Sequence, residues 1–319
     1  MSSADERARL VEAALASISV GSKSFRFASQ LFDQRTRERS WLLYAWCRAC
    51  DDVTDGQTLG HDAVAPADPA ERISYLRART AEALSGQPTG VVAFEALRTV
   101  ARECAIPPAV AYDHLAGFER DAAGWRPANE EELLSYCYQV AGAVGVMMAH
   151  VMGVEPDDKD TLDRAADLGI AFQLANIARD IVDDAQVGRV YLPADWLAEE
   201  GLAGADLSDP RHRPVLARLT RRLARLAERY RSSSRTGAAR LPFRSRWAVL
   251  SASGIYGEVA VRAEALGPRA WDSRITTSKA EKAALVMEAF WEALWPVRPS
   301  PRDGLWTRPR SAEPAPAAP

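Results

Sequence analysis

The stretch LLYAWCRACDDVTD, Leu42 to Asp55, runs from an apolar helical pattern into a cluster of carboxylates. Because residues four apart lie on one face of an α-helix, Asp51 and Asp55 share a face that Arg48 and Tyr44 extend backwards. Acidic side chains near a helix C-terminus oppose the helix dipole, so this cluster is poorly placed for stability alone. The pattern indicates either a charged helix end in water or a site that binds a cation.

A second stretch, FQLANIARDIVDD from Phe172 to Asp184, repeats the arrangement. Three oxygen-bearing side chains follow at a spacing of four residues, with two more polar residues on or beside their face: Asn176, Asp180 and Asp184, then Gln173 and Arg179. Apolar residues occupy the other sides, which indicates a central helix, where unpaired carboxylates are costly. Two such faces across a cavity would suit Mg²⁺, which binds one or two carboxylates and takes other oxygens from water and phosphates. The alternative is two unrelated networks of ion pairs.

Helical periodicity continues along most of the chain, and alternating strand patterns are not evident. The sequence predicts an all-α fold with helices at residues 4–18, 37–55, 70–84, 91–104, 108–118, 129–152, 156–184, 213–233, 243–266 and 278–294. No linker divides residues 1–295, so we expect one domain. Frequent proline after that point, ending in SAEPAPAAP, predicts a disordered tail over residues 296–319.

The composition is that of an ordinary soluble protein: of 319 residues, 47% are hydrophobic and 26% charged, with a net charge of −3. This charge gives no reason to expect nucleic acid as a partner. The most apolar run, Val140 to Val154, is shorter than the roughly 20 residues of a membrane-spanning helix and contains His150. The polar N-terminus has no signal-peptide core, and four cysteines suit a reducing compartment, so we expect a cytoplasmic protein.

These stretches resemble the squalene/phytoene synthase family, the head-to-head prenyl synthases. Five motifs carry the likeness in order along the chain: GSKSF at 21–25, YAWCRACDDVTD at 44–55, YCYQVAGAVG at 136–145, NIARDIVDD at 176–184 and GRVYLP at 188–193. The likeness extends from about Val20 to Leu294. Within the family, the first two motifs look most like those of bacterial carotenoid-type phytoene synthases.

The resemblance implies a single-domain helical prenyl-synthase (isoprenoid synthase) fold with a central cavity. It also implies that two geranylgeranyl diphosphates condense through a cyclopropyl diphosphate to phytoene, the first committed step of carotenoid biosynthesis. Mg²⁺ is the implied cofactor, with Mn²⁺ as a substitute, and NADPH is not expected. Two other interpretations stay open: a squalene or dehydrosqualene synthase acting on farnesyl diphosphate, and an inactive relative that serves as a scaffold or assembly subunit.

The resemblance further assigns roles to residues of this sequence. The implied metal ligands are Asp51, Asp55, Asn176, Asp180 and Asp184. The implied substrate-binding residues are Ser22, Lys23, Ser24, Phe25, Tyr44, Arg48, Gln173, Asn176, Arg179, Tyr256 and, through a looser alignment, Arg274. The residues implied in catalysis are Asp51, Asp55, Arg48, Asp180, Asp184 and Tyr136.

The apolar part of the expected cavity must hold two long chains and keep water away from carbocations. Its candidate lining is Phe25, Val140, Ala141, Val144, Gly145 and Leu174. Gly142 and Gly145 could leave room for a prenyl chain, and close helix–helix packing is the alternative explanation for both.

Two other features have simpler interpretations. Between Arg211 and Arg246, twelve arginines accompany one acidic residue and an apolar stripe, which suits a solvated basic helix face or peripheral contact with anionic lipid. Contact with other enzymes of the carotenoid pathway is a further expectation. The Cys47-x-x-Cys50 pair has no second pair to accompany it, so a zinc or redox site is not expected.

Overall fold

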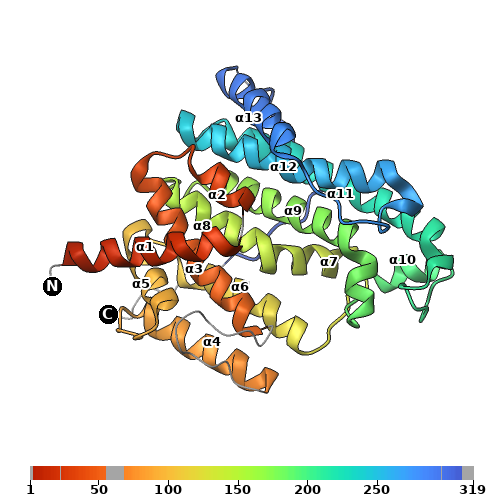
Figure 1. Ribbon diagram of the computed structural model, residues 1–319, viewed down its shortest axis with the longest axis horizontal. Coiled ribbons are helices and arrows are strands. Elements are labelled where there is room, and N and C mark those ends of the chain that lie inside the picture. Colours follow the sequence, from red (N-terminus) through yellow and green to blue (C-terminus); the bar gives the residue numbers. More distant parts are fainter. Residues whose placement is uncertain (1–2, 22, 55–67, 296, 311–319) are drawn as a thin grey trace, which may run out of the picture.

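The computed structural model describes residues 3–21, 23–54, 68–295 and 297–310, and within these ranges the regular structure is entirely helical (Figure 1). The α-helices are α1 (Ser3–Gly21), α2 (Lys23–Ser29), α3 (Gln34–Thr54), α4 (Pro69–Leu84), α5 (Val92–Cys104), α6 (Pro108–Ala122), α7 (Glu130–Cys137), α8 (Ala143–Val151), α9 (Lys159–Gln186), α10 (Ala194–Glu199), α11 (Arg213–Ala238), α12 (Phe243–Leu266) and α13 (Lys279–Leu294). A π-helix, η1 (Tyr138–Gly142), joins α7 to α8, and two short 3₁₀-helices are η2 (Pro210–His212) and η3 (Gly267–Arg269). The predicted all-α fold is confirmed.

The centre of the molecule is α9, which packs against α8, α11 and α12. In Figure 1 it runs through the middle of the bundle. Its apolar side chains, such as Ile170, Leu174 and Ile177, are buried, whereas Gln173 and Asn176 are only partly buried. The predicted central helix is therefore present, and its polar face is less buried than its apolar faces.

A close helix crossing explains the glycines of the small-residue motif. A Cβ atom at Gly169 of α9 would lie 2.2 Å from the carbonyl oxygen of Ala141, and one at Gly145 would lie 2.3 Å from that of Ala165. Side chains would therefore force the two backbones apart, because real Cβ contacts are never this short. Gly142 is buried in the same crossing, so close packing accounts for it.

The helix predicted over residues 129–152 is interrupted at η1, where the i→i+5 bonding of a π-helix replaces the α-helical ladder. Two short helices, α2 and α10, were not predicted, because seven and six residues offer too little periodicity. The other predicted helices are present, with ends that differ by a few residues.

The chain after α13 corrects the expectation of a disordered tail. Residues 300–310 run along α9 and α11, and three arginines of this segment bind Asp163 and Asp167 of α9. The proline-rich composition pointed to disorder, but charged anchors between the prolines hold the segment in place. Residue 296 and residues 311–319 lie outside the described ranges.

Among the described residues, we find no helix that combines the length and the apolar character needed to cross a bilayer.

Candidate active site

One polar face of the site lies near the C-terminal end of α3. Tyr44 stacks on Phe25 of α2, with ring centroids 5.1 Å apart. Burial raises the pKa of the Tyr44 phenol to about 12, and the nearby carboxylate of Asp51 contributes in the same direction. Arg48 forms an ion pair with Asp52 one turn later, while Asp51 is exposed. This face therefore presents a phenol, a guanidinium and carboxylates to the same region.

The second face lies on α9. Arg179 donates two hydrogen bonds to Asp180, with its Nε atom 2.6 Å from Oδ1. The hydrogen bonds to Asp180 are the main cause of the raised pKa of the Arg179 guanidinium. Asn176 and Asp184, which the four-residue spacing puts on the face of Asp180, are partly buried on the same helix, and so is Gln173.

Asp184 lies in a concentration of negative charge. Burial and, after it, the carboxylates of Asp180, Asp183 and Asp121 together raise the pKa of its carboxyl to about 6. The guanidinium of Arg189 acts in the opposite direction. Carboxylates that repel one another in a partly buried site are the donor set that a hard divalent cation stabilises. The residues present therefore fit Mg²⁺.

Asp121 of α6 is a site residue that the sequence analysis missed. Its carboxylate accepts hydrogen bonds from the hydroxyls of Tyr136 and Tyr191, each over 3.0 Å. The two tyrosine rings stack with centroids 5.0 Å apart, and burial strongly raises the pKa of Tyr136. The sequence analysis ended this helix at residue 118, so Asp121 fell in a predicted loop and carried no signal.

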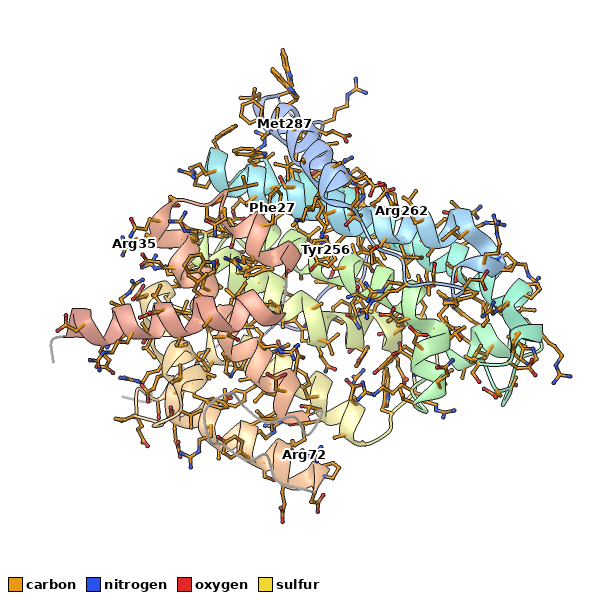
Figure 2. The ribbon with its side chains drawn as sticks, viewed as in Figure 1. Phe27, Arg35, Arg72, Tyr256, Arg262 and Met287 are labelled. Atoms are coloured by element: carbon orange, nitrogen blue, oxygen red, sulfur yellow. The ribbon has the colours of Figure 1, made fainter. Side chains whose placement is uncertain are left out.

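Tyr256 of α12 connects the two faces. Its ring stacks on Phe172 of α9 with centroids 4.4 Å apart. Figure 2 shows Tyr256 near the middle of the molecule. Its phenol acts electrostatically on both the Tyr44 phenol and the Arg179 guanidinium, contributing to the raised pKa of each. The structure thus brings the faces of α3 and α9 together around this residue.

Several predicted site residues are not placed by these contacts. Asp55 and Ser22 lie outside the described residues, and for Lys23 and Ser24 only the backbone is described, in the first turn of α2. Arg274 is exposed between η3 and α13, where it makes no hydrogen bond or ion pair with a described residue.

Within the described ranges, no three acidic, histidine or cysteine side chains lie close enough together to hold a metal ion by themselves. A cation between the two faces would take ligands from both helices and from the substrate. Mg²⁺ commonly binds in this way, with few protein carboxylates and several phosphate or water oxygens.

An apolar cavity of about 290 Å³ lies inside the bundle beside these faces, and Phe25, which stacks on Tyr44, is part of its wall. Phe25, Phe172 and Tyr256 line it, and so do four predicted residues of the small-residue motif: Val140, Ala141, Val144 and Gly145. The predicted lining is confirmed for these four and for Phe25. The prediction that Leu174 lines the cavity was wrong, because its side chain is fully buried in the hydrophobic core.

The cysteine pair of α3 lies beside the polar face. Cys47 and Cys50 are free thiols, and burial raises the pKa of both. The thiolate is the form that acts as a nucleophile or metal ligand, and burial disfavours that form at both positions.

A profile of the squalene/phytoene synthase family matches residues 18–281. A 15-cis-phytoene synthase of Pantoea ananas is 47% identical over 308 residues, covering 94% of this chain and 98% of that protein. A 15-cis-phytoene synthase of Enterobacter agglomerans is 48% identical over 295 residues, covering 91% and 99%. A crystal structure of a dehydrosqualene synthase in complex with ligand superposes with a TM-score of 0.79 at 27% identity, covering 89% of this chain and 96% of that chain.

Proposed function

The chain belongs to the squalene/phytoene synthase family, and from this premise we propose that it condenses two geranylgeranyl diphosphates to phytoene. The enzyme is a prenyltransferase of the phytoene synthase type, and the reaction passes through a cyclopropyl diphosphate. The structural observation that supports this best is that the carboxylate-bearing faces of α3 and α9 lie beside an apolar cavity. Phe25, which stacks on Tyr44, and Tyr256, which acts on both Tyr44 and Arg179, line that cavity. That arrangement suits a substrate with a charged diphosphate head and a long hydrocarbon chain.

We assign the diphosphate head to the polar faces of α3 and α9. Asp51, Asp55, Asn176, Asp180 and Asp184 would hold Mg²⁺, or Mn²⁺ in its place. Bound Mg²⁺ supplies positive charge that stabilises the diphosphate as it leaves. Arg48 and Arg179 contribute guanidinium groups that bind phosphate oxygens.

The two arginine–aspartate pairs give this binding step a defined exchange of partners. Arg48 is paired with Asp52, and Arg179 with Asp180. If Asp180 held the cation, the guanidinium of Arg179 would be available to a phosphate group. The exchange keeps each charge neutralised before and after binding, which limits the desolvation cost in a partly buried site.

The remaining predicted residues surround the same head group. We propose that Ser22, Lys23 and Ser24 bind phosphate oxygens from the start of α2, and that Gln173 does so from α9. Tyr136 and Tyr191 act indirectly, because they hold the carboxylate of Asp121 beside Asp184. The assignment of Arg274 stays a proposal from the resemblance alone, since the residue lies exposed in a loop.

The apolar cavity has two tasks after the diphosphate leaves. It excludes water, which would otherwise capture the allylic carbocation. Two aromatic pairs, Phe25 with Tyr44 and Phe172 with Tyr256, stand at the polar end, and aromatic faces stabilise nearby positive charge. The chain therefore provides both a binding site for the leaving anion and a neutral surface for the cation.

The proposed activity is tested with purified protein, Mg²⁺ and geranylgeranyl diphosphate, without NADPH. We expect release of inorganic diphosphate and a hydrocarbon of forty carbons, and loss of both in EDTA. Full activity in EDTA would remove the metal from the proposal. Failure to release diphosphate under any metal condition would favour the scaffold interpretation.

The farnesyl-specific alternative has less support. The relatives at 47% and 48% identity are phytoene synthases, whereas the dehydrosqualene synthase shares only 27% identity. The shorter diphosphate would give a hydrocarbon of thirty carbons, so the mass of the product separates the two activities.

We further propose that the enzyme is cytoplasmic and that it makes peripheral membrane contact beside the C-terminal end of the arginine-rich region. Most of the arginines of α11 are engaged by acidic partners, as Arg218 is by Glu200 and Arg222 by Glu199. By contrast, α13 exposes a stripe of large apolar side chains: Met287, Trp291, Leu294 and Trp295. The helix lies at the outer edge of the molecule in Figure 1, and Arg246 of α12 hydrogen-bonds the carbonyl of Trp295 beside it.

This contact is tested by sedimentation with vesicles of neutral or anionic phospholipid. Replacing Trp291 and Trp295 with serine should weaken binding, because tryptophan favours the bilayer interface. The control is Val187→Ser, which removes an equally exposed apolar residue elsewhere. Equal binding of all variants would contradict a role for α13.

A further inference from the structure

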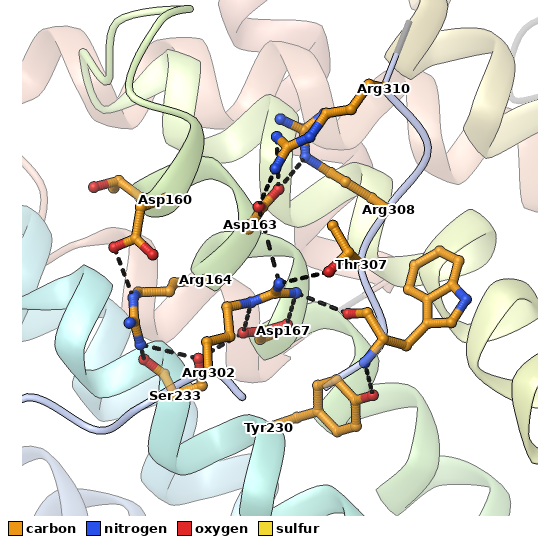
Figure 3. Close-up of polar contacts among 12 residues, drawn as sticks. Asp160, Asp163, Arg164, Asp167, Tyr230, Ser233, Arg302, Thr307, Arg308 and Arg310 are labelled. Carbon is orange, nitrogen blue, oxygen red and sulfur yellow. Dashed lines mark hydrogen bonds and ion pairs between the residues drawn. The ribbon is translucent and has the colours of Figure 1, made fainter. Parts of the chain in front are cut away.

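The segment of residues 300–310, here called the C-terminal strap, is attached to α9 by buried ion pairs (Figure 3). Arg302 donates two hydrogen bonds of 2.8 Å to the two oxygens of Asp167, whose side chain is fully buried. Arg308 and Arg310 bind Asp163 one turn earlier, at 2.9 and 2.7 Å. Burying these carboxylates without partners would be very costly, so the strap is an integral part of the wall behind α9.

Between the two carboxylates on α9 lies Arg164, whose charged group is also held by the strap. Its Nη1 atom donates to the carbonyl oxygen of Ser300 at 3.0 Å and to both the carbonyl and hydroxyl oxygens of Ser233 at 3.1 Å. Its Nε atom donates to Asp160 at 2.9 Å. Oxygen acceptors on three segments therefore fix this guanidinium in one place.

Arg164 also lines the apolar cavity. Because the guanidinium is bound by α11 and the strap, the apolar stem is the part of the side chain suited to face the cavity. Gly237 of α11 lies directly against the stem, since a Cβ atom there would be 2.7 Å from the Cβ of Arg164. The side chain is thus confined from both sides and has little freedom to move out of the way of a ligand.

The position of Arg164 along α9 places it at the end of the cavity remote from the polar faces. The lining residues of α9 run from Phe172, which stacks on Tyr256, back to Thr161. Thr161 lies eleven positions before Phe172, about 16 Å at 1.5 Å per residue, and Arg164 lies eight positions before it, about 12 Å. A prenyl chain whose head lies at the polar faces would therefore reach Arg164 with its far end.

We propose that Arg164, fixed by the C-terminal strap, is the wall that limits how long a prenyl chain the cavity accepts. This inference rests on the proposed function, because it takes the cavity to hold the hydrocarbon part of a prenyl diphosphate. Arg164 is a specificity-determining residue, and Arg302 is a positioning residue that acts through the strap. Replacing Arg164 with a smaller residue extends the cavity toward the strap. Adding a side chain at Gly237, which lies against the stem of Arg164, shortens the cavity.

The test compares turnover of the C15, C20 and C25 prenyl diphosphates by the full-length protein with Mg²⁺. Wild type should turn over the C25 diphosphate at least about 10-fold more slowly than the C20 diphosphate, the size of effect that a few methylenes have in an apolar pocket. Arg164→Ala should raise the C25:C20 ratio by at least about 10-fold. Gly237→Ala should raise the C15:C20 ratio, because the added methyl group pushes the wall inward. Arg302→Ala should act like Arg164→Ala, to a smaller extent.

The ratios separate this role from a structural one, since a merely destabilised protein loses activity equally with all three substrates. Arg218→Ala, which removes an exposed guanidinium of α11, is the matched control and should leave every ratio unchanged. Equal wild-type turnover of the C20 and C25 diphosphates would overturn the inference even if Arg164→Ala failed to fold. Folded Arg164→Ala with unchanged ratios would overturn it as well. A wild type inactive with every diphosphate would instead contradict the proposed function.

Discussion

At the scale of single residues, the site is organised by contacts between neighbouring opposite charges. Arg179 binds Asp180, and Arg48 binds Asp52, while Asp184 keeps a raised pKa among other carboxylates. Each of these side chains was identified from its spacing in the sequence, apart from the partner that Arg48 selects. The helical period determines which residues share a face, but it does not decide which of two adjacent aspartates an arginine will bind.

Asp180→Ala should lower turnover by at least about 10²-fold, comparable to the loss of one preorganised electrostatic contact. The protein should stay folded, because one carboxylate fewer relieves the repulsion felt by Asp184. Asp183→Asn is the matched control, since Asp183 is an exposed neighbouring carboxylate that is not among the predicted ligands. Steady-state kinetics and thermal melts check both variants, and equal losses in the two would contradict the assignment.

Arg179→Lys should keep the fold and the melting temperature but lose most of the activity. Lysine preserves the charge, yet it cannot make the two parallel hydrogen bonds of a guanidinium to a phosphate group. The measurement is the affinity for inorganic diphosphate with Mg²⁺ present, in wild type and variant. Unchanged affinity with near-normal turnover would reduce Arg179 to a structural partner of Asp180.

At the scale of helices, the bundle depends on how closely α9 approaches the helix segment formed by η1 and α8. The glycines of the motif were visible in the sequence, and their two interpretations were packing and room for substrate. The structure supports packing for Gly142, and both for Gly145, which lines the cavity as well. Sequence periodicity could not distinguish them, because it does not report how near two backbones come.

Gly169→Ala should destabilise the protein by at least about 2 kcal/mol, as overpacking of a tight core does. The added Cβ would lie 2.2 Å from a backbone carbonyl, which cannot move aside as a flexible side chain can. Gly254→Ala in α12 is the control, because its nearest contact would be an ordinary 3.6 Å from Leu285. Helix propensity should make that variant equally stable or up to about 1 kcal/mol more stable. Urea unfolding compares them, and equal stabilities would contradict the close crossing.

His114 of α6 should make the fold sensitive to acid. It is buried between Trp46 and Phe118, and burial lowers the pKa of its imidazole to about 4. Since the unfolded chain titrates near pH 6.5, the unfolded state binds more protons between pH 6.5 and 4. The stability contributed by neutral His114 is therefore complete above pH 6.5 and is lost as pH falls toward 4.

The check is the difference in free energy of unfolding between wild type and His114→Gln at pH 7 and pH 5. The contributions of the other titrating groups cancel in this difference. As pH falls, the free energy of unfolding of wild type should decrease by up to about 1.4 kcal/mol per pH unit more than that of the variant. Parallel pH profiles would show that His114 is accessible to protons in the folded state.

At the scale of the whole molecule, long-range contacts account for what the sequence did not predict. The all-α fold, the central helix and most helix boundaries follow from periodicity. Asp121 and the strap do not, because their roles arise only when α6 meets the end of α9 and when residues 300–310 reach Asp163 and Asp167. Composition indicated disorder for the strap, since it cannot register buried partners more than a hundred residues away.

The central claim is that a cavity with two carboxylate faces at its mouth joins two C20 diphosphates. The most direct test is the mass of the hydrocarbon formed by the full-length protein from an equimolar mixture of farnesyl and geranylgeranyl diphosphates, with Mg²⁺ and without NADPH. We expect a product of forty carbons with the formula of phytoene to predominate. A predominant product of thirty carbons would contradict the claim.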